Sequence, residues 1–378
     1  MEDINEEKIR SGVETCLEKG IDIFVIYPYG KKGKLVKKVL NQFYGIKELA
    51  IVDNQLAKSD KRFWNMDDLE RIDKNYVILL SSDNRKIWNE IREELKGKLI
   101  GEVFDLAEEE TEPEIAFNLI GKSMNIDYCN VEQLKYIFEK TKESWKELGE
   151  KEPYWSVVTH NEFKMQNCNE KEIRKFYSMG RLHVAKIVSV LIRNQKVRDW
   201  EELKKLSITE IGCGCGRVTK HLADCFGKVV ATDISAGNLE IARKQIVKDN
   251  VDFQLLKQLE DYNNLAETDV VYSYLVLQHN CPPIIEYMIH VILRLVKVDG
   301  FAIFQVPTYR RDYYFDYRSY MENDSKGIEM HLLPQSKIFQ IAYDRQCIPL
   351  EVYPVFSTGQ EDNSTYFIFR KMASYGTN

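Results

Sequence analysis

The sequence predicts an α/β protein with two successive parallel-sheet units, and three observations support this fold class. Short apolar segments alternate with segments of helical periodicity in two separate parts of the chain of 378 residues. A glycine-rich turn at 210–216 follows directly on one apolar segment and precedes a helical one. Two further apolar segments, 350–355 and 364–370, close the chain and predict a terminal hairpin. Alternation of strands and helices is typical of parallel sheets, because a parallel strand pair needs a crossover connection.

Length and composition are those of an ordinary globular protein with two domains. Hydrophobic residues make up 44% and charged residues 30%, and the net charge of −6 argues against a nucleic-acid partner. The N-terminus MEDINEEKIR is acidic and polar, and no apolar run approaches the length of a membrane span. The eight cysteines include no C-x-x-C pair, so reduced thiols are expected. We therefore expect a cytoplasmic protein without a membrane span, and its homo-oligomerisation stays open.

The first predicted domain is a small parallel α/β unit at residues 1–110. Its strands are expected at 21–27, 49–52, 76–80 and 99–104, and its helices at 1–20, 35–43 and 84–95. An acidic run at 108–112 then opens a helical linker, 111–150, that is expected to bridge to a second domain at 151–378.

The centre of the second domain is the stretch from Leu206 to Ser235, which reads as strand, glycine loop, helix and strand. The helix is expected at about 217–225, and the second strand, 229–232, ends at Asp233. Glycines at such a turn let the backbone approach a ligand, and the following helix N-terminus offers free N–H groups to an anionic group. A carboxylate at the end of the next strand can accept hydrogen bonds from ribose hydroxyls. The stretch therefore predicts a nucleoside-binding unit.

The spacing of the glycines distinguishes between two kinds of nucleoside cofactor. The nicotinamide fingerprint is G-x-G-x-x-G, but here glycines stand at 212, 214 and 216, and Arg217 occupies the third position of that fingerprint. The pattern E-x-G-x-G-x-G from Glu210, with Asp233 after the second strand, resembles motifs I and II of class I S-adenosylmethionine (SAM) methyltransferases. The resemblance covers roughly residues 150–375. It implies a Rossmann-like sheet with a terminal antiparallel hairpin, and SAM as the cofactor.

Further cofactor contacts follow from this resemblance. An aromatic-rich segment resembles the one that folds over the methionine end of SAM and offers Tyr154, Trp155 and Tyr177, although packing alone also explains these aromatics. After strand 251–256 the family often has a carboxylate for the adenine amino group, whereas this chain has Gln258, with Glu260 as a substitute. Tyr274, at the end of strand 268–274, is expected to face the methyl group. The predicted cofactor-binding residues are Tyr154, Trp155, Tyr177, Glu210, Gly212, Gly214, Gly216, Arg217, Asp233, Ile234, Ser235, Gln258, Leu259 and Tyr274.

The acceptor side is predicted from a second aromatic segment and from the histidines. Residues 309–320, after strand 301–306, are rich in tyrosine and arginine, side chains that stack on sugar faces or pair with carboxylates and phosphates. We expect acceptor contacts from Tyr309, Arg310, Arg311 and Tyr313, the alternative being a lid that packs only on protein. A base is needed if the acceptor is a hydroxyl, and histidine suits this role. His279 and His331 are the catalytic candidates, with a structural role as the alternative for His279, and no metal site is expected.

The first domain adds a weaker indication of the acceptor. It resembles the Rossmann-like N-terminal domain of bacterial sugar-modifying acetyltransferases, with Gly30, Gly33, Asp53 and Asn54 in the places that those domains use around a nucleotide-sugar. The sequence thus favours SAM-dependent O-methylation of a sugar or nucleotide-sugar-derived small molecule, a carbohydrate modification in surface-polysaccharide metabolism. The alternatives are a lipid-like or natural-product acceptor, a nucleotide-sugar oxidoreductase, or a non-catalytic SAM- or nucleotide-binding module.

Overall fold

The computed structural model describes residues 4–72, 76–82, 84–95, 102–106, 124–310, 313–323, 328–355 and 363–373. The chain divides into two compact units, the first comprising Met1–Ala116 and Asn169–Trp200, and the second Phe117–Cys168 and Glu201–Asn378. The predicted boundaries, 1–110, 111–150 and 151–378, differ from this division at two places. Residues 169–200 group with the first unit, and the helix predicted as a linker groups with the second.

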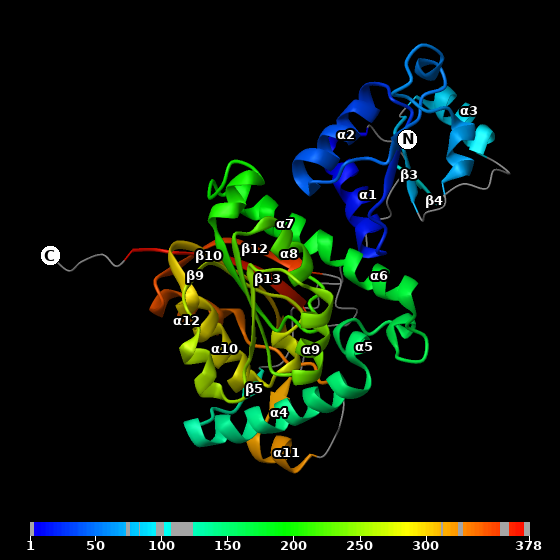
Figure 1. Cartoon of the computed structure of the whole chain (residues 1–378). Helices are drawn as coiled ribbons and strands as arrows, with labels where there is room; N and C mark the ends of the chain where they lie inside the picture. The colour runs from blue at the N-terminus through cyan, green and yellow to red at the C-terminus, as the bar shows by residue number, and fades with distance from the viewer. Residues whose placement is uncertain are drawn as a thin grey trace. The chain divides into compact units, whose positions relative to one another are not determined.

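The first unit is built on a four-stranded parallel sheet in the order β2-β1-β3-β4 (Figure 1). The strands are β1 (Phe24–Tyr27), β2 (Ala50–Ile51), β3 (Val77–Leu80) and β4 (Glu102–Asp105). The helices are α1 (Glu6–Glu18), α2 (Lys31–Tyr44), α3 (Arg85–Leu95), α6 (Glu170–Ser178) and α7 (Gly180–Arg193), with short 3-10 turns at Leu56–Lys58 and Met66–Arg71. Leu182 and Ala185 of α7 are buried in the same core as α1 and α2. The predicted small parallel unit is therefore confirmed.

Two polar residues of this unit, which stand where the resembling domains contact a nucleotide-sugar, have structural partners. The Asp53 carboxylate accepts the backbone N–H groups of Gln55 and Leu56 at 3.1 and 3.0 Å. The Asn54 amide oxygen accepts the N–H of Met66 at 3.0 Å. These bonds fold the chain after β2, and they account for both side chains without a ligand.

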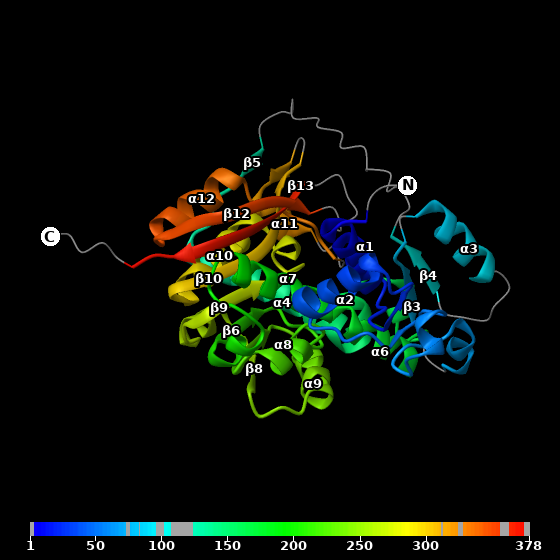
Figure 2. The same cartoon turned by 90° about the horizontal axis from the view of Figure 1, so that it is seen from above.

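The second unit is built on a seven-stranded sheet in the order β12-β13-β10-β9-β6-β7-β8, whose succession can be followed in Figure 2. Strands β6 to β10 are parallel, and β13 runs antiparallel to both β10 and β12. This is the class I methyltransferase order with the predicted terminal hairpin. The strands are β6 (Ser207–Ile211), β7 (Lys228–Asp233), β8 (Val251–Leu255), β9 (Thr268–Ser273), β10 (Val296–Tyr309), β12 (Cys347–Val355) and β13 (Asn363–Lys371).

Helices pack on this sheet and close its carboxyl edge. They are α4 (Val131–Lys151), α5 (Pro153–Val157), α8 (Thr219–Cys225), α9 (Ala236–Gln245), α10 (Pro282–Leu295), α11 (Tyr317–Glu322) and α12 (Gln335–Asp344), with 3-10 turns at Asn161–Phe163, Glu201–Lys205, Leu259–Asn264 and Leu277–His279. A short pair, β5 (Asn125–Ile126) and β11 (Tyr314–Phe315), joins two distant segments of the unit. The core lies between α10 and the sheet, where Phe304 stacks on Phe367 and Phe369. Among the described residues, no helix is both long and apolar enough to cross a membrane.

Gly149 explains how α4 joins this unit. The helix α4 continues through this glycine to Lys151. A Cβ at position 149 would lie 2.1 Å from Ser235 Oγ at the start of α9. The glycine therefore permits a close approach of the helices α4 and α9.

Candidate functional site

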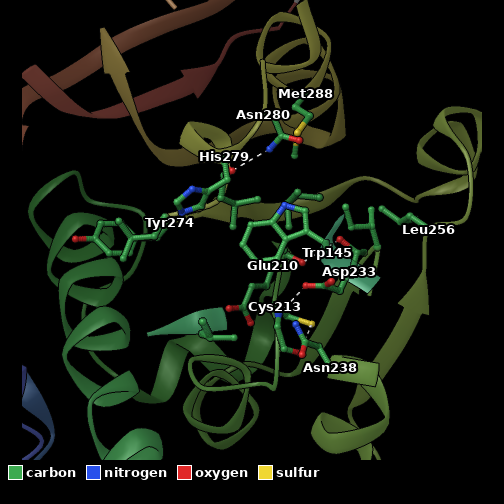
Figure 3. A pocket seen from close by; sticks show the side chains of 18 of the residues that line it. Trp145, Glu210, Cys213, Asp233, Asn238, Leu256, Tyr274, His279, Asn280 and Met288 are labelled. Carbon is green, nitrogen blue, oxygen red and sulfur yellow. Dashed lines mark hydrogen bonds between the residues drawn. The ribbon is translucent and has the colours of Figure 1, made fainter. Parts of the chain in front are cut away.

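A pocket lies at the carboxyl ends of β6, β7 and β9, and residues of α4 and α5 also line it (Figure 3). Eight residues that the sequence singled out line it, namely Glu210, Gly212, Gly214, Arg217, Asp233, Ile234, Tyr274 and His279. Ligands of open α/β sheets bind at this edge, so the position agrees with a nucleoside site.

The glycine loop takes a backbone conformation that only glycine adopts readily. Gly212 and Gly214 have φ values of +74° and +55°, in the left-handed region. A Cβ on Gly212 would lie 2.5 Å from Val276 Cγ2, and one on Gly214 would lie 2.6 Å from Val157 Cγ2. Since Val157 and Val276 also line the pocket, side chains at the glycine positions would collide with its wall.

Asp233 holds this loop against the end of β7. Its carboxylate accepts the N–H of Gly214 at 2.8 Å and the N–H of Ser235 at 2.7 Å. Burial raises the pKa of the carboxyl, and the two N–H donors oppose that shift. A carboxylate has about four lone-pair sites, so the two backbone bonds leave acceptor capacity for hydroxyl groups of a ligand.

Glu210 and Arg217 bring two ionisable groups to the pocket. Glu210 Oε2 accepts the hydroxyl of Thr219 at 2.6 Å, and burial raises the pKa of the Glu210 carboxyl to about 8, against the opposing effects of Thr219 and Arg217. Burial also lowers the pKa of the Arg217 guanidinium from its ordinary value. Among the described residues, the buried Nε of Arg217 has no hydrogen-bond partner.

His279 is held as a neutral imidazole. Its Nδ1 lies 2.9 Å from the carbonyl oxygen of Glu329, and its Nε2 lies 3.2 Å from Nε2 of Gln278. A carbonyl only accepts, so Nδ1 carries the proton and Nε2 accepts from the amide. Burial lowers the pKa of His279 to about 4. The centre of the Trp145 ring lies 5.5 Å from the centre of the His279 ring. In Figure 3 the Trp145 ring extends into the pocket, with His279 and Tyr274 on one side of it and Asp233 and Leu256 on the other.

The residue after Tyr274, Leu275 at the end of β9, has a left-handed backbone conformation. Leu275 has a φ of +57°, and its N–H donates to Gln305 Oε1 at 3.0 Å. Gln305 is fully buried on β10, and its amide nitrogen donates to Gln278 Oε1 at 2.9 Å. Backbone strain of this kind persists only when surrounding bonds impose it. The two glutamines thus fix the chain that lines the pocket from Tyr274 to His279.

His331 belongs to a hydrogen-bonded chain beside the pocket and is not one of its lining residues. Its Nδ1 lies 2.7 Å from the hydroxyl of Tyr313, and its Nε2 lies 3.1 Å from Glu329 Oε2. Burial opposes ionisation of Glu329, but the hydrogen bond and charge of His331 outweigh it, and the pKa of Glu329 lies below its ordinary value. The backbone N–H of His331 donates to the carbonyl of Gln278 at 2.7 Å, which ties this chain to the turn that carries His279.

Of the other residues predicted for the acceptor, two can be placed. Tyr309 ends β10, and its buried hydroxyl has no partner among the described residues. Arg310 places its guanidinium 5.7 Å from the centre of the Tyr313 ring. Arg311 lies outside the described residues.

Seven residues predicted to bind the cofactor do not line the described pocket. A Cβ on Gly216 would meet Ile246 at 2.5 Å, so this glycine serves helix packing. Ser235 caps α9, and Gln258 is exposed at the start of a 3-10 turn. The Trp155 ring lies under the Lys164 ammonium group, and Tyr177 packs edge-on to Phe176 in the first unit. The remaining two, Tyr154 and Leu259, are buried.

Sequence reasoning missed the contribution of α4. Phe138 and Trp145 both line the pocket and stand at i and i+7, on one face of the helix. That spacing was a usable signal, but the segment had been interpreted as a linker. Asn238, Leu256 and Tyr262 were also missed as lining residues. No group of three or more His, Cys, Asp or Glu side chains in the described part of the chain is placed as a metal site requires.

A family model described as Methyltransferase domain matches residues 208–300. The second half of the chain contains a methyltransferase domain. The match covers β6 to the start of β10, the strands whose carboxyl ends build the pocket.

Similar curated proteins are themselves named methyltransferases. The methyltransferase domain is similar to the ubiquinone biosynthesis O-methyltransferase of Rickettsia bellii (strain OSU 85-389), with 25% identity over 152 residues, 37% of this chain and 62% of that protein. It is also similar to the malonyl-[acyl-carrier protein] O-methyltransferase of Priestia megaterium (strain DSM 319 / IMG 1521), with 31% identity over 77 residues, 20% of this chain and 28% of that protein. The chain spans less than two thirds of the length of these relatives.

Among solved structures, the chain is similar to the magnesium protoporphyrin IX methyltransferase of Synechocystis PCC 6803 with bound SAH. The TM-score is 0.44 and the identity 15%, over 62% of this chain and 99% of that one.

Proposed function

We propose that the pocket of the methyltransferase domain binds SAM and that the protein transfers the methyl group to an oxygen atom of a small molecule. The observation that carries this proposal is the left-handed glycine loop held by Asp233 at the carboxyl edge of the sheet. That edge also supplies an apolar wall of Ile234 and Leu256, suited to an adenine ring.

The residues present fit a sulfonium cofactor. The Asp233 carboxylate retains acceptor capacity for ribose hydroxyls, and Gly212 and Gly214 of the glycine loop line the same pocket. The Trp145 ring supplies an aromatic face, and a cation near such a face is attracted by the ring. When bound, SAM supplies a methyl group on a positively charged sulfur, a carbon already activated for displacement.

The tasks left to the chain are alignment, exclusion of water and proton removal. Tyr274, Leu275 and Val276 are held by the Gln305–Gln278 pair and form a rigid wall where the acceptor approaches. Val157 of α5 and Trp145 of α4 add apolar side chains to the lining of the pocket.

We assign proton removal to the chain of Tyr313, His331 and Glu329. A hydroxyl, an imidazole and a carboxylate joined in this order form the arrangement by which a base is oriented and its protonated form stabilised. His279 is a poorer base, because burial lowers its pKa to about 4 and, among the described residues, its ring has no carboxylate partner that would stabilise the protonated form.

Oxygen is the favoured acceptor atom because the curated relatives are named O-methyltransferases. Among oxygen acceptors, the sugar favoured by the sequence remains a prediction that rests on the resemblance of the first domain and on the segment 309–320, which is rich in tyrosine and arginine. A lipid-like or natural-product hydroxyl is the alternative within the same chemistry.

Calorimetric titration of the full chain with S-adenosylhomocysteine (SAH) and, separately, with NAD(H) tests the cofactor. We expect micromolar binding of SAH that is lost in Asp233→Ala. Binding of NAD(H) without binding of SAH would refute the proposal. Incubation of the full chain with methyl-labelled SAM and a panel of phenols, quinols, carboxylates and sugar nucleotides then tests the acceptor. His331→Ala is expected to retain SAH binding and lose transfer.

A further inference from the structure

A buried glutamine, Gln305, joins β10 to the turn that follows β9 and to β13. It is fully buried, and it is not one of the residues that line the pocket. Its Oε1 accepts the N–H of Leu275 at 3.0 Å, and its Nε2 donates to Gln278 Oε1 at 2.9 Å and to the hydroxyl of Ser364 on β13. A buried amide needs partners for its oxygen and for both N–H groups, and these three bonds supply them.

The hydrogen bonds that lead away from Gln305 have only one possible direction. A backbone N–H can only donate, so Leu275 fixes the amide oxygen of Gln305 on its own side and turns the NH2 group towards Gln278. Gln278 accepts there with its oxygen, and its nitrogen therefore acts as the donor to Nε2 of His279, 3.2 Å away. This Nε2 has to be unprotonated, so the ring carries its proton on Nδ1, 2.9 Å from the carbonyl oxygen of Glu329.

The far end of this chain of hydrogen bonds meets the proposed base. The carbonyl oxygen of Glu329 accepts from His279, whereas its side-chain Oε2 lies 3.1 Å from Nε2 of His331. The backbone N–H of His331 donates to the carbonyl of Gln278 at 2.7 Å. Two bonds thus tie the segment 329–331 to the turn at Gln278, and the bond from His279 exists only while Nδ1 carries the proton.

We infer that Gln305 is a positioning residue for methyl transfer. By fixing the direction of these hydrogen bonds it keeps His279 in the Nδ1–H form, and this form holds Glu329 in place against His331. The inference rests on the proposed function, in which His331 belongs to the chain that removes the acceptor proton. Because Gln305 acts from β10 without a place in the pocket lining, its loss affects the reaction and not the binding of the cofactor.

Gln305→Glu tests the direction of the chain with little change of shape. One oxygen of the new carboxyl can accept the N–H of Leu275 in either protonation state. The other oxygen can donate to Gln278 when it is protonated, as the amide does, but it can only accept when the group is ionised. Gln278 then has to turn its NH2 group to position 305 and its oxygen to His279. Burial at this position raises the pKa of the new carboxyl, so that both states are reached between about pH 6 and pH 9.

Nitrogen chemical shifts of the His279 ring, measured by NMR, report this reversal. At pH 6 we expect Gln305→Glu to show the Nδ1–H form of the wild type. At pH 9 the proton should move to Nε2, because the oxygen of Gln278 then faces Nε2 and a ring with a pKa of about 4 does not hold a second proton. Nδ1 would then face the carbonyl of Glu329 with a lone pair, and their hydrogen bond is lost.

Methyl transfer and cofactor binding are measured in parallel. Transfer is followed with methyl-labelled SAM and the panel of phenols, quinols, carboxylates and sugar nucleotides, and the Kd of SAH is measured by calorimetry. At pH 6 we expect kcat of Gln305→Glu within about threefold of the wild type. At pH 9 its kcat relative to the wild type should fall by at least about tenfold, because a well-placed base contributes about a hundredfold or more. The Kd of SAH should stay within about threefold of the wild type at both pH values.

The matched control is Thr308→Val. Thr308 is also buried on β10, and its hydroxyl lies 3.0 Å from that of Thr365 on β13. The variant removes a buried hydrogen bond between the same two strands but leaves the chain from Gln305 to Glu329 intact. It should therefore keep the Nδ1–H form of His279 and the kcat of the wild type at both pH values. Gln305→Met, which removes all the hydrogen bonds of this side chain, should lower kcat at pH 6 and pH 9 alike.

A proton that stays on Nδ1 of His279 in Gln305→Glu at pH 9 would overturn the inference and leave the proposed function in place. Transfer at the wild-type rate after the proton has moved to Nε2 would do the same. If Gln305→Met does not fold, Gln305→Glu still decides, because its own state at pH 6 is the reference. A wild type that binds no SAH, or that methylates no compound of the panel, would refute the proposed function and the inference together.

Discussion

Nδ1 of His279 lies 2.9 Å from the carbonyl oxygen of Glu329, and this contact fixes which nitrogen of the ring carries the proton. The proton must be on Nδ1, because the carbonyl can only accept. The same residue, Glu329, holds His331 through its side-chain oxygen at 3.1 Å. One residue therefore orients both histidines, but it gives His279 a neutral backbone partner and His331 a carboxylate.

The first prediction concerns the charge of His279. We expect its imidazole to stay neutral, as the Nδ1–H tautomer, from pH 5 to 9, because burial holds its pKa at about 4. Nitrogen chemical shifts of histidine side chains measured by NMR over this range check it, and His279→Gln identifies the resonances. A ring that titrates between pH 6 and 7 would contradict the prediction and restore His279 as a candidate base.

The second prediction concerns stability and Glu210. Its folded pKa of about 8 lies above the unfolded value near 4.3, so the folded state binds more protons between these limits and loses stability as pH rises. Glu210→Gln removes this dependence. We expect its free energy of unfolding relative to the wild type to increase by about 3 kcal/mol from pH 5.5 to pH 9.

Urea unfolding of the ligand-free proteins at both pH values measures this difference. Asp269→Asn is a control from the same unit: the pKa of Asp269 is lowered, so its carboxyl is ionised in both the folded and the unfolded state from pH 5.5 to pH 9, and this variant should differ from the wild type by the same amount at both pH values. A difference between Glu210→Gln and the wild type that is constant with pH would show that Glu210 is ionised in the folded state throughout.

The third prediction concerns the glycine loop. In Gly212→Ala, the new Cβ would lie 2.5 Å from Val276 Cγ2 at a left-handed φ of +74°. The left-handed conformation alone costs about 1–2 kcal/mol, and movement of Val276 narrows the pocket. We expect lower stability and a loss of SAH affinity of at least about tenfold.

Gly30→Ala is the matched control for that variant. Gly30 has no atom within 4 Å of the position of its Cβ, and its φ of −77° is ordinary. The control should keep both the stability and the SAH affinity of the wild type. Unchanged SAH binding in Gly212→Ala would mean that the loop does not approach the ligand.

The order of elements in both units could be predicted from the sequence, because the alternation of apolar and helical segments and the position of glycines at turns are local signals. The residues of the β6–β7 unit, from Glu210 to Asp233, could be placed at the pocket for the same reason: their spacing along one strand–loop–helix fixes their geometry. The terminal hairpin of β12 and β13 was predicted as well, whereas the position of β13 between β10 and β12 is seen only in the structure.

Contacts between distant segments could not be predicted in the same way. Trp145 reaches the pocket only because Gly149 lets α4 approach Ser235, a contact of residues far apart in the chain. Likewise, the partners of His279 and His331 are set by the segment around Glu329 folding back on the turn at Gln278. The sequence supplied the residue types, but only the packing shows that Gln258 points to solvent whereas Leu256 lines the pocket.

The fourth prediction concerns which of two tryptophans, Trp145 or Trp155, lies next to the sulfur of the cofactor. Trp145 lines the pocket beside His279, whereas Trp155, which the sequence favoured, lies under Lys164 and does not line it. SAM carries a positive sulfur and SAH does not, so an aromatic face near the sulfur favours SAM by about 0.5–2 kcal/mol. In Trp145→Leu we expect the affinity for SAM to fall about threefold to tenfold more than the affinity for SAH. Calorimetric Kd values for both ligands measure this ratio, and Trp155→Leu should leave it unchanged. If the ratio moved in Trp155→Leu and stayed constant in Trp145→Leu, the sulfur would lie next to α5, as the sequence alone suggested.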